Sequence, residues 1–575
     1  MAAVAWLAVL LASPLASAQT VDSPGRTGLP EDWSHRHVVF SGATPGRPDV
    51  AGAVVSDARF WHQQWRRLLH PVKPKPKVKP KPKKHRVDWS VNLGGAGAFL
   101  APGTFPAKYT FDINATPSCA NDFAVFALNI GGSGSQATIV AYSNLYAGST
   151  PNTGICGSGL PTVKWAYNTG GAINTSPVLS LDGSMVAYVE SRTNLAGGSI
   201  LHILKWKAGQ GSVAAPVSPD QVVGSWSSCT AGNSCIVNLI FNNAQPDSNS
   251  SPFYDYSNDV LYVGDDNGQL HKFTPVFSGT PTEVLAGWPI TGVGGTGRKL
   301  TSAVYDSVSK NIFYGDDGGH FGYIREVGST RGVCAGVGPP PPPCQGLNNY
   351  PTPFAGAIID APLLDPVAQT VFFFIGNNGA SHAAVQQADT QLSSNGPQAN
   401  VGQNGPAMFV GAFDNNYYTN PSSGFVYVCG YTSSSTVNPT LYRIGFNSNN
   451  NMKTANDGNS FALSNSATGT TCSPMTEIFN PPALKDWLFV SVGDGCTGTG
   501  GGSAGCVMSL DITSAFPASA TGRAEAKGTS GIVVDNVSTS NQASSIYFST
   551  QDNMLCGDGV STGGCAVKVT QSGLQ

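Results

Sequence analysis

Two acidic turns carry the side chains whose type and spacing could bind a metal. The segments 264–268 (Gly-Asp-Asp-Asn-Gly) and 315–319 (Gly-Asp-Asp-Gly-Gly) each place two adjacent carboxylates between hydrophobic runs. Carboxylate oxygens are hard ligands of the kind that Ca²⁺ prefers, but the alternating pattern of an EF-hand loop is absent and tight turns favour Asp in any case. We therefore expect turn residues and no cofactor, with a Ca²⁺ site as the alternative. The four carboxylates are Asp265, Asp266, Asp316 and Asp317.

Histidine is the other residue type that could ligate a metal or transfer protons. Four histidines lie in or beside expected strands, namely His202, His271, His320 and His382. No two of them are spaced at i, i+2 or i, i+4, so no histidine metal pair is predicted. No Gly-x-Ser-x-Gly elbow precedes a helix, and the glycine-rich run 292–297 lies between strands without a βαβ unit. Catalysis would need side chains from separate parts of the fold, so no catalytic residue is assigned.

The cysteines indicate an oxidising compartment. There are 12 of them, and they fall into six pairs of neighbours along the chain. Sequential pairing is the simplest connectivity, and each short disulfide would stabilise its loop by about 2–3 kcal/mol. Zinc ligation is the alternative, but no Cys-x2-Cys knuckle is present. The expected disulfides are Cys119–Cys156, Cys229–Cys235, Cys334–Cys344, Cys429–Cys472, Cys496–Cys506 and Cys556–Cys565.

The first 18 residues also predict export. An apolar run over residues 4–11 is followed by small residues, and Ala-Ser-Ala at 16–18 fits a cleavage site, although no Lys or Arg precedes the run. No later segment reaches the roughly 18 apolar residues that a membrane-spanning helix needs. We therefore expect a secreted or periplasmic protein without a transmembrane segment.

Charge divides the chain into a basic arm and an acidic body. Residues 1–86 hold 14 Lys and Arg against 5 Asp and Glu, whereas residues 87–575 hold 17 against 29. An acidic body repels phosphates, so nucleic acid is not an expected partner.

The arm itself has two parts. Residues 19–70 are turn-rich and end in a predicted amphipathic helix over 58–70, in which Trp61 and Trp65 lie on one face. Residues 71–86 are rich in Pro and Lys and predict an extended linker. We expect the helix to pack on the main body and the linker to act as a semi-rigid spacer. The alternative is peripheral contact of residues 59–86 with an anionic envelope surface.

A repeat over residues 87–575 predicts the fold. Strands that begin with Ser or Thr followed by Pro or Ala recur at intervals of about 46 to 75 residues, each followed by a β-prone strand and a Gly/Asp/Asn turn. This is the period of a four-stranded propeller blade. The sequence therefore predicts an all-β propeller of eight blades, with seven as the alternative. The four clearest copies begin at Thr175, Ser251, Thr301 and Ala361.

Ring closure is expected at the final blade. The chain ends soon after the strand 566–570, which leaves that blade without an outer strand. The segment around Tyr109 resembles the outer strands near Trp165 and Trp288. We therefore predict that the segment around Tyr109 completes the last blade and removes the exposed sheet edge.

These features resemble the quinoprotein-type (PQQ-like) propellers of exported bacterial proteins. The resemblance is carried by Ser-Pro-Val-Leu-Ser-Leu-Asp-Gly at 176–183, by the hairpin Gly-Asp-Asp-Asn-Gly-Gln-Leu at 264–270 and by the aromatic strands at Trp165 and Trp288. It implies the fold for about residues 105–575. The enzymatic members hold their quinone over two adjacent, joined cysteines, and this chain has no Cys-Cys pair.

Two functional hypotheses follow. The first is a binding or scaffold module at the cell envelope that engages an envelope polymer, a glycan or a protein. The second is an enzyme with its site in the propeller channel, acting as a lyase, a hydrolase or a quinone-type oxidoreductase. The missing catalytic signatures favour the first.

Overall fold

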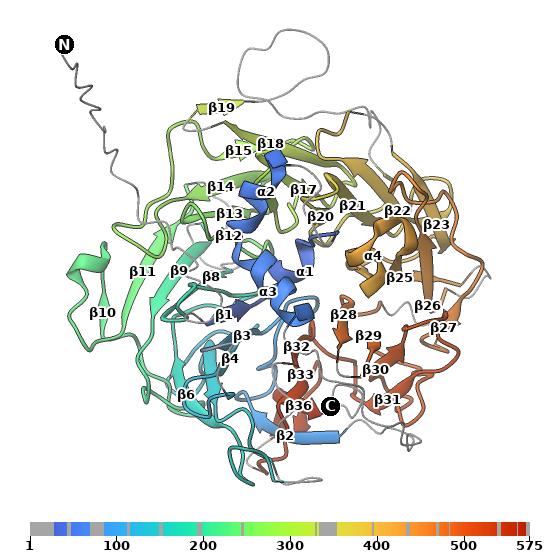
Figure 1. Cartoon of the computed structure of the whole chain (residues 1–575). Helices are drawn as coiled ribbons and strands as arrows, with labels where there is room; N and C mark the ends of the chain where they lie inside the picture. Colours follow the sequence, from blue (N-terminus) through green and yellow to red (C-terminus); the bar gives the residue numbers. More distant parts are fainter. Residues whose placement is uncertain are drawn as a thin grey trace, which may run out of the picture.

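The described residues form eight sheets around a common axis, as the blades of a β-propeller (Figure 1). Each sheet has four or five strands, and nearly all neighbouring strands are antiparallel. The expected eight-bladed, all-β propeller is therefore confirmed. The computed structural model describes residues 28–42, 48–68, 86–111, 116–148, 153–191, 198–242, 247–327, 330–332, 354–393, 396–432, 437–466, 471–481, 483–536, 542–559 and 562–570.

The blades follow one another in chain order, and within a blade successive strands usually lie in order from the axis outward. Three blades depart from this order: β1 is added inside blade 1, β11 lies inside β10 in blade 2, and β2 is the outermost strand of blade 8. Blade 1 contains β1 (Leu29–Glu31), β3 (Ala107–Thr110), β4 (Phe123–Ala127), β5 (Ile139–Ser143) and β6 (Thr162–Tyr167). Blade 2 contains β7 (Val178–Leu179), β8 (Met185–Glu190), β9 (Ile200–Lys205), β11 (Cys235–Ile240) and β10 (Gln221–Val222). Blade 3 contains β12 (Phe253–Asp255), β13 (Val260–Gly264), β14 (Gln269–Phe273) and β15 (Ile290–Thr291). Blade 4 contains β16 (Val304–Asp306), β17 (Asn311–Gly315), β18 (Phe321–Val327) and β19 (Thr330–Gly332).

The second half of the ring has the same plan. Blade 5 contains β20 (Leu363–Asp365), β21 (Thr370–Ile375), β22 (His382–Asp389) and β23 (Gln398–Gln403). Blade 6 contains β24 (Ala412–Phe413), β25 (Phe425–Tyr431), β26 (Pro439–Gly445) and β27 (Phe461–Ala462). Blade 7 contains β28 (Thr476–Asn480), β29 (Lys485–Val492), β30 (Cys506–Asp511) and β31 (Thr521–Ala524). Blade 8 contains β32 (Val533–Asn536), β33 (Ser544–Ser549), β36 (Cys565–Thr570) and β2 (Arg86–Asn92), with a separate hairpin of β34 (Met554–Leu555) and β35 (Thr562–Gly563).

The second strand of each blade is buried along its whole length or at every residue after the first. All five residues of β13 and all five of β17 are buried, and so are the last five of β21. These strands are continuous apolar runs because blades pack against both faces of each sheet, which leaves no solvent-facing side. The turns after them need backbone that only glycine adopts easily, and Gly268, Gly319 and Gly379 have φ values of 80°, 79° and 86°.

The ring is closed by β2, and the prediction that the segment around Tyr109 closes it was wrong. β2 pairs antiparallel with β36 and forms the outermost strand of blade 8. Tyr109 instead lies in β3, near the axis in blade 1, between β1 and β4. An aromatic strand signature cannot distinguish an inner from an outer position, because it records burial and not the neighbouring strand.

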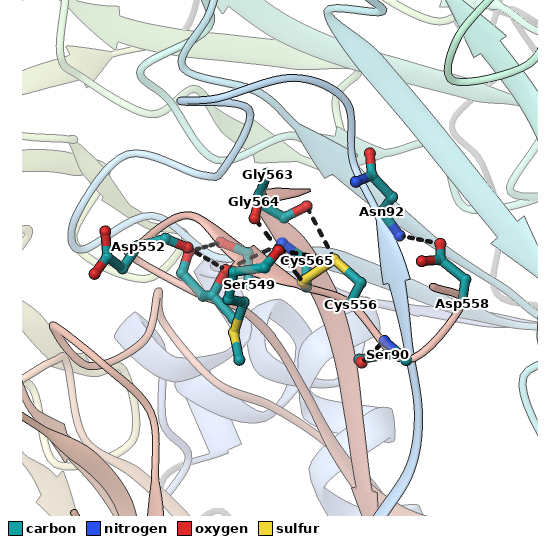
Figure 2. Close-up of a disulfide and its surroundings, with 12 residues drawn as sticks. Ser90, Asn92, Ser549, Asp552, Cys556, Asp558, Gly563, Gly564 and Cys565 are labelled. Carbon is teal, nitrogen blue, oxygen red and sulfur yellow. Dashed lines mark hydrogen bonds between the residues drawn. A yellow bond between two sulfur atoms is a disulfide. The ribbon is translucent and has the colours of Figure 1, made fainter. Parts of the chain in front are cut away.

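A disulfide loop holds β2 in place (Figure 2). Cys556 and Cys565 are joined across nine residues of sequence. Within that loop, the carboxylate of Asp558 accepts the backbone N–H of Asn92 at 2.7 Å, and the N–H of Gly557 donates to Ser90 Oγ at 2.6 Å. The loop therefore contacts β2, which comes from the opposite end of the sequence.

Three helices cover one mouth of the ring (Figure 1). They are α1 (Ser34–His37), α2 (Pro48–Val55) and α3 (Ala58–Leu68). Outside this group, the described residues contain α4 (Asn415–Thr419) and the short 3-10 helices Trp226–Ser228 and Pro421–Ser423.

The structure buries more of α3 than its apolar spacing predicted. Trp65 is buried as expected, but Arg59 and His62 are buried as well, and Trp61 is only partly covered. Arg59 pairs with Asp57. The face that packs on the ring is thus partly polar, and it is not available for a membrane surface while it remains packed there.

The predicted Pro/Lys linker connects two parts of the same ring. Residues 69–85 lie outside the described residues, as does the predicted signal segment 1–18. On one side of the linker, α3 packs over the axis, and on the other side β2 begins at Arg86, which pairs with Thr570.

Candidate functional site

The first described segment of the chain fills the axis of the ring. We call residues 28–42 the plug. Its strand β1 pairs with β3 in blade 1, and Val38 pairs in parallel with Leu364 in blade 5. Between these two contacts, Trp33 is buried and donates its indole N–H to the carbonyl of Pro252 in blade 3 at 3.2 Å. The plug therefore crosses the channel and contacts blades on opposite sides.

A buried ion cluster joins the plug to α3. The carboxylate of Glu31 accepts from the guanidinium of Arg36 at 3.3 Å and also pairs with Arg66. Burial alone would raise the pKa of Glu31, but Arg66 and Arg36 outweigh it and hold that pKa below its ordinary value. Arg66 also donates to the carbonyl of Val534 in blade 8 at 2.9 Å. One carboxylate thus links the plug and the helix, and Arg66 carries the link to the ring wall.

On the opposite side of the plug, the ring encloses an axial cavity of about 310 Å³. Trp33 and His37 of the plug line it together with residues that precede the innermost strands of several blades. The same strands end at residues such as Tyr256 and Ser257, which contact the plug and the loop before α3. Among the described residues, the plug and the helices therefore cover the channel at the mouth opposite this cavity. The wall residues are Ala101, Pro102, Gly103, Thr104, Phe105, Asn129, Asn174, Ser176, Asn249, Ser251, Ser302, Ile359, Asp360 and Phe409.

Serine hydroxyls join successive blades around this cavity. Ser176 Oγ accepts the backbone N–H of Phe105 at 2.9 Å, Ser251 Oγ accepts that of Ser176 at 2.8 Å, and Ser302 Oγ accepts that of Ser251 at 2.6 Å. These serines occupy equivalent positions in blades 2, 3 and 4, and each bonds the blade before it. The chain of bonds explains why Ser recurs at the start of the repeat.

Asp360, which precedes β20 in blade 5, also joins two blades, but it accepts a hydrogen bond from the following blade. Its two carboxylate oxygens accept the backbone N–H groups of Ala361, at 2.8 Å, and of Val410 in the next blade, at 2.9 Å. Burial raises the pKa of Asp360, against the opposing effect of His37. The Asp360 carboxyl is therefore a structural acceptor that also faces the cavity.

Two buried acceptors on the lining make no hydrogen bond to any described residue. They are Asn174 Oδ1 and His37 Nε2. His37 Nδ1 lies 3.3 Å from the carbonyl of Pro362, and since a carbonyl only accepts, that nitrogen carries the hydrogen. Burial lowers the pKa of His37, so the ring is neutral near pH 7 and Nε2 presents a lone pair. Its nearest carboxyl oxygen, Asp360 Oδ1, is 3.6 Å away, beyond a normal hydrogen bond.

The four aspartates considered for Ca²⁺ each bond protein groups. Asp265 Oδ1 accepts the backbone N–H groups of Asn267 and Gln269, and its other oxygen lies 3.2 Å from His271 Nε2. Asp316 repeats this pattern with Gly318 and His320. The carboxylates of Asp266 and Asp317 both contact Lys299, the first its side chain and the second its backbone N–H.

The described residues contain no group of three or more His, Cys, Asp or Glu arranged to hold a metal.

The four histidines are distributed around the blades and do not converge. His202 lies between Glu190 and Asn238 in blade 2, and His271 lies between Asp265 and Glu283 in blade 3. His382 lies 3.1 Å from the carbonyl of Gly402 in blade 5. His37, a histidine that lines the axial cavity, precedes the repeats and was not considered from the sequence.

Five of the six expected cysteine pairs are disulfides in the structure, and the pair Cys334 and Cys344 lies outside the described residues. The five are Cys119–Cys156, Cys229–Cys235, Cys429–Cys472, Cys496–Cys506 and Cys556–Cys565.

One sequence signal could have located the cavity. Residues 174–177 read Asn-Thr-Ser-Pro and residues 249–252 read Asn-Ser-Ser-Pro, so the motif Asn-x-Ser-Pro begins two successive repeats. In the structure both asparagines and both serines line the axial cavity. A polar residue repeated before successive innermost strands indicates an axial site, because these strands begin at the same mouth of the ring.

Together, these observations define a disulfide-linked, eight-bladed propeller whose axis is closed on one side by its own N-terminal segment. The chain matches no protein-family model, and it has no significant match among curated proteins. It is similar in fold to BamB from Moraxella catarrhalis, at 11% identity and a TM-score of 0.37, covering 84% of this chain and 97% of that one. It is also similar to Sqt1 from Chaetomium thermophilum, at 8% identity and a TM-score of 0.46, covering 84% and 99%.

A third solved structure of similar fold is the dihydro-heme d1 dehydrogenase NirN in complex with DHE, at 12% identity and a TM-score of 0.38, covering 80% of this chain and 77% of that one. These likenesses concern the propeller fold alone. Within the described part of the chain, no helix has the length and apolar character that crossing a membrane requires.

Proposed function

We propose that this protein is a secreted or periplasmic binding module of the cell envelope, and that the axial cavity is its binding site. The observation that carries the proposal is the construction of the cavity. Its walls come from successive blades, its floor comes from the plug, and two buried acceptors on it lack hydrogen-bond partners. Concave sites with a few convergent polar groups are the usual form of small-ligand sites.

An extracytoplasmic location is supported by the disulfides and by the signal-like first 18 residues. Five disulfides in one chain are typical of oxidising compartments. The basic Pro/Lys segment would then keep the propeller close to anionic envelope polymers. Replacing residues 71–84 by a neutral Gly/Ser segment of equal length tests that role. The measurement is how the protein divides between envelope and soluble fractions, and we expect the variant to shift toward the soluble fraction.

A second candidate function is catalysis in the same cavity. It is favoured by one observation, which is that a neutral imidazole and a carboxyl with a raised pKa face each other at 3.6 Å, as His37 and Asp360 do. Such a pair could exchange a proton with a bound hydroxyl. A catalyst converts its ligand, whereas a binding module releases it unchanged.

The test of the binding site uses a variant that fills the cavity from its rim. Ile359 lines the cavity and is 40% exposed, so Ile359→Trp adds bulk without displacing a buried side chain. Leu285→Trp is the matched control, because Leu285 is also exposed and lies in the outer part of blade 3. We expect ligands that raise the Tm of the wild type and of Leu285→Trp to have no effect on Ile359→Trp. Equal stabilisation of all three proteins would overturn the assignment, and mass spectrometry of the recovered ligand separates binding from catalysis.

A further inference from the structure

We infer that the axial cavity takes a neutral, hydroxyl-rich ligand, of the size and chemistry of one sugar unit. The inference rests on the proposed binding function and adds the chemical class of the ligand. It follows from the hydrogen-bonding groups, the charge and the size of the cavity.

The partnerless acceptors require donors from the ligand. Asn174 Oδ1 and His37 Nε2 belong to side chains that line the cavity, and neither atom makes a hydrogen bond to a described residue. Both atoms are covered, so a ligand reaches them when these side chains rotate toward the cavity. A buried acceptor left without a partner costs about 1–3 kcal/mol. An apolar ligand would leave this cost in place, whereas hydroxyl groups delivered through the cavity would remove it.

The remaining polar groups suit a partner that also accepts. Ser302 lines the cavity and is partly exposed, and its oxygen accepts a backbone N–H, which leaves its own hydrogen to donate. Asn249 is exposed on the same lining, and its amide N–H donates to Asp266, which leaves its side-chain carbonyl oxygen as an acceptor group. Hydroxyl groups both donate and accept, and they match this mixture better than a carboxylate or an ammonium group does.

Charge on the lining disfavours ionic ligands. Among the described residues that line the cavity there is no Lys or Arg, so an anion would meet no cation. The carboxyl on the lining, Asp360, already accepts two backbone N–H groups, which leaves it less able to pair with a cation. Ion binding in a partly buried site requires such a partner to offset desolvation.

The volume and the lining of the cavity also fit one sugar unit. A volume of about 310 Å³ is at the lower end of the range for ligand sites. The ring of Phe409 is partly exposed on the lining, and Gly103 packs beside it without a side chain. An aromatic ring next to amide and hydroxyl groups can contact the apolar face of a pyranose while the polar groups bind its hydroxyls.

The experiment measures binding to the full-length protein by titration calorimetry and by thermal shift. The neutral probes are glucose, galactose, mannose and N-acetylglucosamine, and the charged probes are choline and citrate. The variants are Asn174→Leu, which removes one partnerless acceptor while keeping the branching and the number of side-chain heavy atoms, Ile359→Trp and the control Leu285→Trp. Because Asn174 Oδ1 bonds no described residue, its loss should not lower the Tm, so a binding defect in this variant reports on the ligand.

We expect at least one neutral sugar to raise the Tm of the wild type and of Leu285→Trp. Asn174→Leu should weaken that sugar's Kd about tenfold, and Ile359→Trp should abolish binding. The inference is overturned if no neutral sugar binds, or if Asn174→Leu leaves the Kd unchanged. If choline or citrate binds and Ile359→Trp abolishes this, the ligand class is wrong while the binding site stands. If a probe binds Ile359→Trp as well as it binds the wild type, the binding site itself is wrong.

Discussion

The amine of Lys568 lies 2.9 Å from Oδ2 of Asp88, and both side chains are fully buried. Lys568 belongs to β36 near the end of the chain, and Asp88 belongs to β2, the strand that closes the ring. The pair spans the one sheet contact on which closure depends. Burial lowers the pKa of Lys568 and raises that of Asp88, so each group depends on the other to remain charged.

Breaking this pair should destabilise the whole ring. Lys568→Met leaves the Asp88 carboxylate buried without its cation, which costs about 3–5 kcal/mol. Lys527→Met is the control, because Lys527 pairs with Asp552 at the surface, where such pairs contribute about 0–1 kcal/mol. Thermal unfolding should show a marked fall in Tm for the first variant only. A similar Tm in both variants would contradict the role of the pair in closure.

Removing the disulfide beside β2 should loosen the closure locally. Cys556→Ser with Cys565→Ser should cost about 3 kcal/mol, as the chain-entropy model gives for a loop of this length. The matched control removes Cys229–Cys235, which closes a loop of similar length in blade 2. Hydrogen exchange of residues 86–92 should rise in the first variant and stay unchanged in the control. Faster exchange in both would mean that the effect is global.

A buried histidine should make stability depend on pH. Burial alone would lower the pKa of His271, but hydrogen bonds with Asp265 and Glu283 outweigh it and raise that pKa above 6.5. The stability that protonated His271 contributes is therefore fully present below pH 6.5, and it is lost as the pH rises through the raised pKa. The Tm difference between the wild type and His271→Gln should be largest in acid and should narrow toward alkaline pH. A Tm difference between the two proteins that does not change with pH would show that protonation of His271 does not contribute to stability.

The serine chain around the axis should contribute at each link. Ser251→Ala removes the acceptor for the backbone N–H of Ser176 and leaves that buried group unpaired, at a cost of about 1–3 kcal/mol. Ser228→Ala, at an exposed serine, should leave the Tm nearly unchanged. If the two variants unfold at the same temperature, the blade-to-blade bonds carry no net stability.

The plug should be part of the core. Trp33 is 2% exposed and packs on His37 and Phe253, so Trp33→Ala should cost about 3–5 kcal/mol. Phe111→Ala is the control, because Phe111 is 51% exposed. Thermal unfolding with intrinsic fluorescence measures both variants. A Trp33→Ala variant as stable as the control would indicate that the plug is only loosely held.

The blades could be predicted because their signals are local. Consecutive apolar residues indicate a strand such as β13, and Gly, Asp and Asn indicate a turn such as 264–268. Both signals are readable because side-chain burial and backbone conformation are set within a few residues. Three of the cysteine pairs were predictable for the same reason, because Cys229–Cys235, Cys496–Cys506 and Cys556–Cys565 each close a loop of ten residues or fewer. Cys119–Cys156 and Cys429–Cys472 span 37 and 43 residues, and they were paired only as neighbours in chain order.

The closing strand and the plug could not be predicted in this way. β2 (Arg86–Asn92) pairs with β36 at the far end of the chain, and β1 (Leu29–Glu31) pairs with β3 (Ala107–Thr110) across the linker. Nothing in the composition of β1 or β2 states which sheet edge the strand joins. Trp65 was expected on the packed side of its helix, but Arg59 and His62 were not, because their burial depends on partners such as Asp57 that only the packed structure supplies.

The sequence by itself determined the repeated four-stranded unit, the turns and the short-range disulfides, because each depends on propensities and contacts within a few residues. It predicted eight blades but left seven as the alternative. Only the tertiary structure decided that β2 closes the ring, that residues 28–42 fill its axis and that Asn174, Ser302 and Asp360 surround one cavity. Those features arise where the starts of separate blades meet around a common axis. Convergence of that kind is a property of the ring geometry and leaves no pattern in any single stretch of residues.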